Sequence, residues 1–300
     1  AKICIIDDGI ELGHRAFQGR LLCGKDMHAM ESLMPDHKFG EEMHGTACTS
    51  IAASADEHVM GVAPEALIMP IRQKGLGSVL EAEAFYWAAV NGADVISCSW
   101  GPPDGDILDA SDDHLVHYIP DHTRLAIDYA TTKGRSGKGC VVLFAAGNGS
   151  EAISNDGYAA YDKVLAIGAS NKMDQPTIYS DYGPPIFCMF PSGDYQVVLL
   201  KLEQLYGIAV ADRIGIECYS PNDYYPFFDG TSASCPGVAG VVALMLSVNP
   251  SLTRLEVKQI LQQACKKIGS AADYNQQSNT YSDKYGYGLV QADLAIQYAL

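Results

Sequence analysis

The chain has 300 residues, of which 48% are hydrophobic and 19% charged, and its formal net charge is −16. This length can bury one large core, so we expect a single domain over residues 1–300, and no apolar run reaches the roughly 18 residues that a membrane segment needs. The negative charge argues against nucleic acid as a partner, because a phosphate backbone attracts a basic surface.

Short apolar runs alternate with segments of helical periodicity along the chain. The runs predicted to be buried strands are Ile3–Ile6, Ala66–Arg72, Asp94–Trp100, Cys140–Ala146 and Val164–Ala169. Apolar residues at helical spacing predict helices over Leu80–Asn91, Thr123–Lys133 and Leu255–Ile268. This alternation is typical of an α/β fold with a doubly wound, mostly parallel sheet that carries helices on both faces.

Two segments interrupt the alternation. Pro102–Asp121 is rich in Asp and Pro and is interpreted as a surface loop. Pro184–Asp229 is long and contains the aromatic run Tyr224–Phe228. Its middle part, Val197–Ile208, fits a strand or a helix equally well, and no linker divides the chain into two domains.

The nine cysteines form no CxxC pairs and show no zinc-ligand spacing. Cys4, Cys98 and Cys140 lie in apolar runs and are expected to be small buried hydrophobes. The odd number favours free thiols and a cytoplasmic, reducing compartment, with secretion as the alternative. A leader removed from the N-terminus would leave the compartment open.

Two polar residues near the N-terminus, Asp7 and His44, are candidate functional residues. Asp7 closes the first predicted strand and precedes Asp8-Gly9, a position where open α/β sheets place their functional sites. An isolated acid there is more often a turn former. His44 stands before Gly-Thr and a run of small residues, which suggests a helix packed close to the sheet with His44 at its start.

Two further polar residues occupy special positions. Ser232 opens the segment Ala233–Val248, which is apolar almost all round and is predicted to be a buried helix. A serine there feels the positive end of the helix, and its backbone N–H can point at a developing oxyanion. Asn148 follows a buried strand, and its amide could donate a second such hydrogen bond. Taken alone, Ser232 would be interpreted as a helix N-cap and Asn148 as part of a turn.

Together these residues indicate hydrolysis, because Asp7, His44 and Ser232 follow one of the known chain orders of a Ser-His-Asp triad. The surrounding segments resemble the four signature blocks of the subtilisin family: Ile5–Ile10, His44–Thr46, Ala145–Gly149 and Gly230–Pro236. Gly61–Pro64 and Tyr285–Val290 resemble family blocks too, so the likeness covers essentially the whole chain. It implies a single serine endopeptidase domain with Asp7, His44 and Ser232 as catalytic triad and Asn148 as oxyanion donor.

Three segments resemble the kexin/furin branch, whose members cleave after basic residues: Asp7–Gly9, Ser97–Gly105 and Asn155–Tyr158. By that likeness Asp104 and Asp156 line the primary specificity pocket, and Asp8, with Glu41 as a further candidate, lies near the next pocket. The resemblance implies these substrate-binding residues: Asp8, Ser99, Trp100, Gly101, Asp104, Asp156 and Tyr158. Carboxylates form charge-assisted, bidentate bonds with a guanidinium, so we expect a polypeptide substrate with Arg or Lys at the cleavage site.

The same resemblance implies a structural Ca²⁺ beneath the pocket. Asp104, Glu151 and Asp181 occupy positions where the branch supplies oxygen ligands. Ca²⁺ takes about six to eight oxygens, which acids, carbonyls and water can provide. The competing interpretation is a scattered acidic surface, since the chain carries 36 acids.

The chain also departs from the branch. It lacks an obvious counterpart of the branch's disulfide cysteines, and Cys48 matches only the unpaired one. The branch carries a β-rich domain after the catalytic one, so a pro-segment or flanking domain outside this chain is an expected partner. The alternatives are a broad-specificity subtilisin-type protease, a peptide ligase or macrocyclase on the same scaffold, and an inactive binding module.

Overall fold

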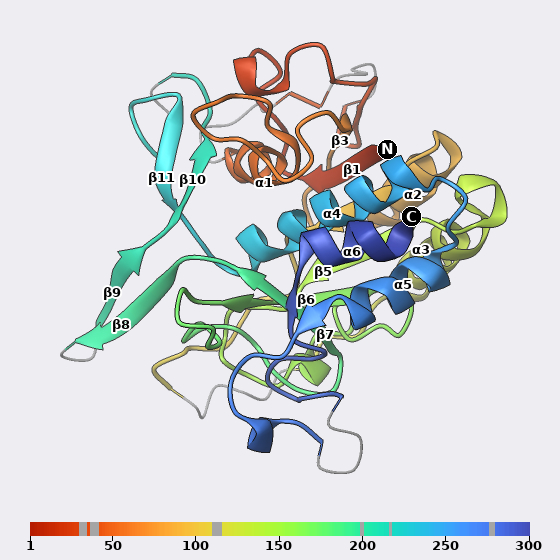
Figure 1. The fold of residues 1–300 in the computed structure, drawn as a ribbon. Helices are drawn as coiled ribbons and strands as arrows, with labels where there is room; N and C mark the ends of the chain where they lie inside the picture. Colours follow the sequence, from red (N-terminus) through yellow and green to blue (C-terminus); the bar gives the residue numbers. More distant parts are fainter. Residues whose placement is uncertain (30–34, 37–41, 110–115, 199–200, 216–217, 276–279) are drawn as a thin grey trace.

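The computed structural model describes residues 1–29, 35–36, 42–109, 116–198, 201–215, 218–275 and 280–300 (Figure 1). In these residues the main sheet has the order β12-β13-β7-β6-β5-β4-β1-β3-β2. Its strands are β1 (Lys2–Asp7), β2 (Lys25–Asp26), β3 (Leu67–Arg72), β4 (Val95–Cys98), β5 (Val141–Ala145), β6 (Leu165–Ser170), β7 (Ile186–Pro191), β12 (Cys265–Lys266) and β13 (Leu289–Val290). Neighbouring strands run parallel except β12 and β13.

Helices cover both faces of this sheet (Figure 1). They are α1 (His44–Ala53), α2 (Val79–Val90), α3 (Asp121–Lys133), α4 (Thr231–Val248), α5 (Arg254–Gln263) and α6 (Ala292–Ala299). Along β1, Ile3 and Ile5 enter the core beneath α4, whereas Cys4 and Ile6 enter the core beneath α2 and α3. Every second residue therefore faces each layer, as a sheet buried on both sides requires. The predicted doubly wound α/β fold is confirmed.

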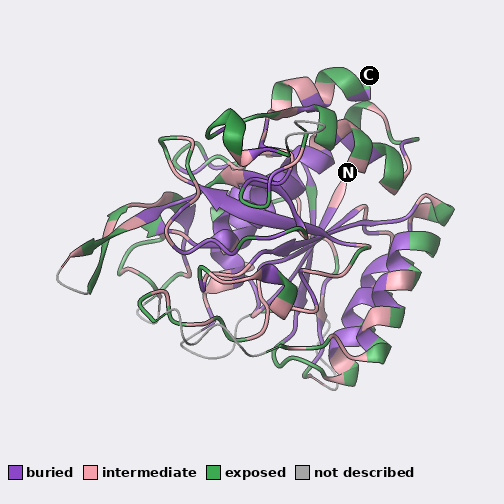
Figure 2. Cartoon of the chain, turned by 90° about the horizontal axis from the view of Figure 1, so that it is seen from below, coloured by how far each residue is buried: buried purple, intermediate pink, exposed green. Residues whose placement is uncertain are grey.

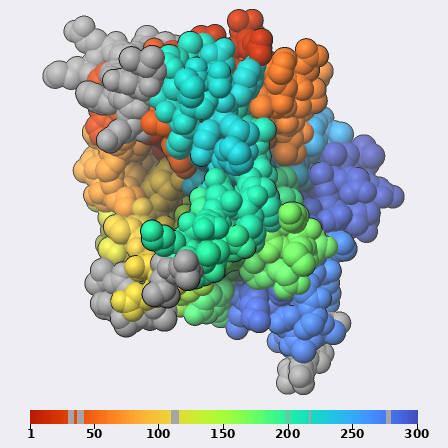
Figure 3. Space-filling view, turned by 90° about the vertical axis from the view of Figure 1, so that its left-hand side faces the viewer, coloured from red at the N-terminus to blue at the C-terminus, as the bar shows by residue number. Residues whose placement is uncertain are grey.

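The segment 184–229, which interrupts the predicted alternation, is largely strand. Its first part is β7, a buried strand of the main sheet. The rest contains two antiparallel pairs outside the main sheet, β8 (Asp194–Val198) with β9 (Lys201–Tyr206), and β10 (Ile208–Ala211) with β11 (Tyr224–Phe228). Figures 1 and 3 show these pairs together on one side of the molecule. The undecided stretch Val197–Ile208 is mainly β-strand in its described part.

The C-terminal part differs from expectation in one helix. The helix predicted over Leu255–Ile268 ends at Gln263, because Cys265 and Lys266 leave it to pair with β13 at the sheet edge. β2, β13 and α6 were not predicted, since the two strands are only two residues long. Strands of two residues have no periodicity that a sequence could reveal.

Among the described residues, the core helix α4 is the one helix that is both long and apolar enough to be compared with a membrane span. By length and composition it could cross a membrane, but 78% of it is buried inside the fold. Figure 2 shows this central region as almost entirely buried, with exposed residues on the outer faces of the peripheral helices. All nine cysteines lie in the described residues, and none of them forms a disulfide there.

Candidate active site

Three of the predicted residues meet at the carboxyl end of β1. Asp7 is the last residue of β1, whose neighbours β3 and β4 lie on its opposite sides. His44 is the first residue of α1, and Ser232 is the second residue of α4. Strand order reverses around β1, and such switch points are where open α/β sheets bind ligands.

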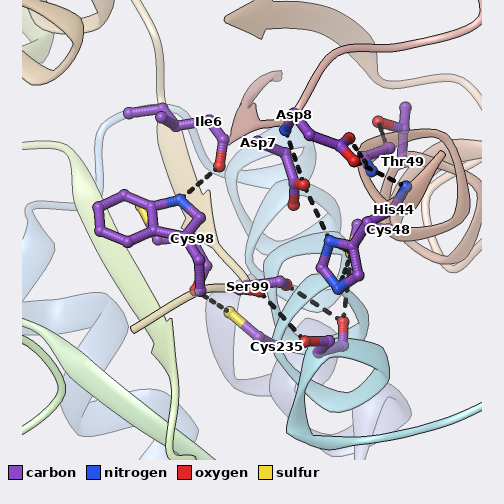
Figure 4. A network of polar contacts seen from close by, with 12 residues as sticks. Ile6, Asp7, Asp8, His44, Cys48, Thr49, Cys98, Ser99 and Cys235 are labelled. Carbon is purple, nitrogen blue, oxygen red and sulfur yellow. Dashed lines mark hydrogen bonds and ion pairs between the residues drawn. The ribbon is translucent and has the colours of Figure 1, made fainter. Parts of the chain in front are cut away.

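Asp7 holds the His44 ring (Figure 4). Its Oδ1 accepts a hydrogen bond from His44 Nδ1 at 2.9 Å and a second from the backbone N–H of Asp8 at 2.8 Å. Burial alone would lower the pKa of His44, but the Asp7 charge, assisted by the hydrogen bond, raises that pKa well above its ordinary value. The geometry leaves Nε2 as the ring nitrogen that points away from Asp7.

Asp8 fixes the start of the helix that carries His44. Its Oδ2 accepts from the backbone N–H of His44 at 3.1 Å, and its Oδ1 from that of Gly45 at 2.8 Å. A side chain at residue 45 is excluded, because a Cβ there would lie 2.2 Å from the carbonyl oxygen of Gly9. Burial and the Asp7 charge raise the pKa of Asp8 to about 6. The sequence analysis did not predict this positioning role and placed Asp8 near a substrate pocket.

Ser232 lies in the same cleft as His44, but its hydroxyl donates to the main-chain carbonyl of Ser99 at 3.1 Å. Within the described residues no hydrogen bond links Ser232 Oγ to His44. The cleft has a volume of about 520 Å³ and also contains Asn148. The expected acid, base and hydroxyl are therefore brought together, with the hydroxyl turned towards the sheet.

The amide of Asn148 has a defined orientation. Its Oδ1 accepts from the backbone N–H of Thr231 at 2.8 Å and from the Thr231 hydroxyl at 3.0 Å. The amide nitrogen is therefore the atom left to donate, and here it is directed at Asp104 Oδ2 at 3.4 Å. An oxygen atom bound beside Ser232 would compete with Asp104 for this donor.

The three predicted calcium ligands form one cluster. Asp104, Glu151 and Asp181 each offer a carboxylate oxygen within 4.8 Å of the others. A Cβ on Gly147 would lie 2.1 Å from Asp181 Oδ2 and 2.9 Å from Asp104 Oδ1, so only glycine leaves room for the carboxylates. Burial, with the charges of Asp104 and Glu151, raises the pKa of Asp181 to about 8. Gathered carboxylate oxygens of this kind suit Ca²⁺.

Asp156 faces the segment that follows β4. Its Oδ1 accepts from the backbone N–H groups of Tyr158 and Ala159, at 2.7 and 3.2 Å. A Cβ on Gly101 would lie 2.9 Å from its Oδ2, so glycine at this position leaves room for the carboxylate. Burial raises the pKa of Asp156 to about 6.

The assignment of Tyr158 as a substrate contact does not fit its position. The residue is only 2% exposed, and its hydroxyl donates to Glu81. Its ring packs against Trp100 and Phe144. The turn after Asp156 directs Tyr158 into the core, where its ring packs against Trp100.

Trp100, which packs against Tyr158, is also hydrogen-bonded to β1. Its indole N–H donates to the carbonyl of Ile6 at 2.7 Å (Figure 4). Trp100, Gly101 and Asp8 line a second cavity of about 410 Å³, which adjoins Asp7. Glu41, the further candidate for this region, lies outside the described residues.

One part of the cleft was missed in the sequence. The side of the cleft formed by β8, β9, β11 and the preceding loops is aromatic and apolar: Tyr179, Tyr195, Leu202, Tyr219, Tyr225, Phe227 and Phe228. The Phe228 ring lies 5.5 Å from the ring of His44. The run Tyr224–Phe228 was the only signal of this wall, because its other members are dispersed along the chain.

A buried acid, a histidine and a helix-terminal serine at the carboxyl edge of a doubly wound sheet define the class of serine hydrolases with chain order Asp-His-Ser. The chain belongs to the subtilase family, whose model, Peptidase_S8, matches residues 1–288.

The relatives and structures that resemble the chain agree with this family. The chain is 44% identical to a calcium-dependent protease of Trichormus variabilis, over 99% of this chain and 46% of that protein. It is 27% identical to kexin of Saccharomyces cerevisiae, over 98% of this chain and 35% of that protein. The serine protease of Aeromonas sobria shares the fold, with a TM-score of 0.82 at 18% identity, over 100% of this chain and 60% of that one. The chain thus spans less than half the length of these two curated relatives.

Proposed function

We propose that the protein is a serine endopeptidase that cleaves polypeptides after Arg or Lys. The observation that carries the hydrolytic part is the hydrogen bond from His44 to the buried carboxylate of Asp7, in a cleft that also contains Ser232. His44 takes the proton of the Ser232 hydroxyl as that oxygen attacks the scissile carbonyl, and later gives it to the leaving amine. Asp7 keeps the ring in one tautomer and stabilises the imidazolium.

The oxyanion is stabilised by two donors in this proposal. The Asn148 amide nitrogen is one, because Thr231 occupies the amide oxygen. The backbone N–H of Ser232, at the positive end of α4, is the other. The attack also requires the Ser232 hydroxyl to turn from the carbonyl of Ser99 towards His44 Nε2, a rotation about one side-chain bond.

The preference for basic residues rests on carboxylates beside the segment 99–101. Asp156 presents one oxygen at Gly101, and burial raises the pKa of this carboxyl group, so a bound cation would stabilise its charged form. Two of the curated relatives, kexin and a dibasic-processing endoprotease of Yarrowia lipolytica, support this preference at 27–28% identity. A planar guanidinium can bind two carboxylate oxygens at once, so Arg is expected to be preferred over Lys.

A structural Ca²⁺ is also proposed at Asp104, Glu151 and Asp181. The crowded carboxylates fit this cation, and the relatives named calcium-dependent proteases support the proposal. When bound, the ion supplies charge compensation that keeps all three acids ionised together. We further propose a reducing compartment, since nine thiols remain unpaired in the fold.

Covalent labelling with a fluorophosphonate tests the proposed function. The wild-type chain should be labelled and Ser232→Ala should not, while Ser234→Ala, two residues along the same helix, should still be labelled if it folds. Mass spectrometry of a peptide-library digest then identifies the products. Hydrolysed peptides support an endopeptidase, whereas joined or cyclic products would replace it with a ligase. Labelling of Ser232→Ala equal to the wild type would contradict the proposal.

A further inference from the structure

A cysteine lies beside the acid–histidine pair and has no part in the proposed hydrolysis. Cys48 follows His44 by one turn of α1, and its Sγ lies 3.6 Å from Nδ1 and 3.9 Å from Nε2 of that histidine (Figure 4). One ligand atom from each of Asp7, His44 and Cys48 lies within 4.8 Å of the others. Oxygen, nitrogen and sulfur donors are therefore gathered at one point.

We propose that Asp7, His44 and Cys48 form an inhibitory Zn²⁺ site. Zinc–ligand distances of about 2.0–2.3 Å place two ligands of a tetrahedral ion about 3.3–3.6 Å apart. Here Sγ and Nδ1 are 3.6 Å apart, and Nδ1 and Oδ1 of Asp7 are 2.9 Å apart. These two separations lie within a few tenths of an ångström of the tetrahedral spacing, and an oxygen of Asp7 lies within 4.8 Å of Cys48 Sγ.

The second oxygen of Asp7 points independently to a missing ligand. Asp7 is 5% exposed, and its Oδ2 has no hydrogen-bond partner among the described residues. A buried carboxylate oxygen without a partner is costly, and a cation beside the carboxylate would remove that cost. A cation could therefore bind either Oδ1 or Oδ2 of Asp7.

The site is closed by protein on one side and open on the other. Cys48 is 1% exposed, whereas 29% of the His44 side chain is exposed and lines the cleft. An ion can therefore enter from the cleft, and a water molecule there can supply the fourth ligand. The thiolate and imidazole select Zn²⁺ over Ca²⁺, which binds oxygen ligands.

Binding would stop the proposed catalysis through a change of tautomer. Zn²⁺ takes the lone pair of His44 Nδ1, so the Nδ1 proton is displaced and the neutral ring carries its proton on Nε2. The Cys48 thiol releases its proton to solvent and binds as thiolate. Nε2 then donates and can no longer accept the proton of Ser232. This consequence rests on the proposed function, whereas zinc binding itself does not.

Binding is measured in the Ser232→Ala background, with Ca²⁺ in excess. Equilibrium dialysis should find one Zn²⁺ per chain, and Co²⁺ as a probe should give a thiolate-to-cobalt charge-transfer band. Adding Cys48→Ala should remove both signals. Adding Cys23→Ala, which removes an exposed thiol, should leave them unchanged. If Ser232→Ala binds no zinc, or if the Cys48→Ala background binds it equally well, the site does not exist.

Inhibition is measured with the active chain. Micromolar Zn²⁺ should inhibit the wild type, and a zinc-selective chelator should restore activity while Ca²⁺ remains bound. Cys48→Ala should stay active and need at least about tenfold more Zn²⁺, since even an outer-shell change costs about 10–100-fold in affinity. Cys48→Ser provides a second variant if the alanine disturbs folding. Equal zinc sensitivity of these variants and the wild type would refute the proposal. Peptidase activity in Ser232→Ala would refute the proposed function instead and leave the binding result intact.

Discussion

Ser99 and Ser232 each donate a side-chain hydrogen bond to the main-chain carbonyl of the other, both at 3.1 Å. Ser99 directly follows β4, and Ser232 belongs to the first turn of α4. The reciprocal pair fastens the start of this helix to the carboxyl edge of the sheet. It also gives the Ser232 hydroxyl a resting partner before substrate binds.

The first prediction concerns this pair. Ser99→Ala removes the donor to the Ser232 carbonyl and keeps the Ser99 carbonyl, so the start of α4 should loosen. We expect a loss of about 1–3 kcal/mol in the free energy of unfolding and a lower kcat with little change in KM. Denaturant titration and steady-state kinetics measure the two effects. Ser247→Ala, near the exposed end of the same helix, is the control and should change neither; an unaffected Ser99→Ala would show that the pair is dispensable.

The second prediction concerns the acid. Asp7→Asn should lower kcat by about 10⁴, because the amide favours the wrong tautomer of His44. The charge of Asp7 raises the pKa of His44, so without it the rising limb of the pH–rate profile should move to lower pH. A limb that stays in place would show that another group controls the profile.

Asp7→Asn also tests how much the Asp7–His44 ion pair contributes to the free energy of unfolding. The folded-state pKa of His44 lies above its unfolded value of about 6.5. This contribution is therefore fully present below about pH 6.5 and is lost as pH rises through the folded-state pKa. Asp7→Asn should destabilise the protein more at pH 5.5 than at pH 9, as measured by denaturant titration at both values; the reverse order would contradict the assigned ion pair.

The third prediction concerns Asn148. Asn148→Ala should reduce kcat by about 10²–10³ and leave KM almost unchanged, because the oxyanion forms only in the transition state. Asn222→Ala, in an exposed loop, serves as the control. A rise in KM with an unaltered kcat would mean that Asn148 binds substrate in the ground state.

The fourth prediction concerns Ca²⁺. A cation that binds only the folded chain at 100 times its Kd stabilises it by about 2.7 kcal/mol, so chelation should lower the Tm by several degrees. Asp181→Asn should abolish most of this response, while Asp121→Asn, an exposed acid at the start of α3, should keep it. An identical melting curve with and without chelator, in protein shown to be metal-free, would exclude the site.

The fifth prediction concerns specificity. Asp156→Asn should reduce kcat/KM for substrates with Arg at the cleavage site by far more than for those with Leu, since the cation loses its buried partner. Asp174→Asn changes a half-exposed acid that is ion-paired with Lys266 and should leave both values unchanged. A wild-type preference for cleavage after Leu or Phe would leave only the general subtilisin-like function.

The sequence could predict the sheet strands that carry the site, because each is a continuous apolar run such as Val141–Ala145. It could not predict that Asp8 caps α1, since that contact joins residues 36 and 37 positions apart across the fold. Tyr158 was misassigned because a turn of two residues separates a pocket wall from the core. The strands β8–β11 are short and show no regular alternation of buried and exposed residues, so their sequences give only a weak strand signal.

The two strand pairs β8–β9 and β10–β11 stand outside the main sheet, yet they form one wall of the cleft. The helix α4, which carries Ser232, is by contrast packed into the core along most of its length. Substitutions at the exposed positions of β8 and β9 can therefore alter which peptides fit the cleft at little cost to folding. The architecture separates an evolvable substrate preference from chemistry that tolerates almost no change.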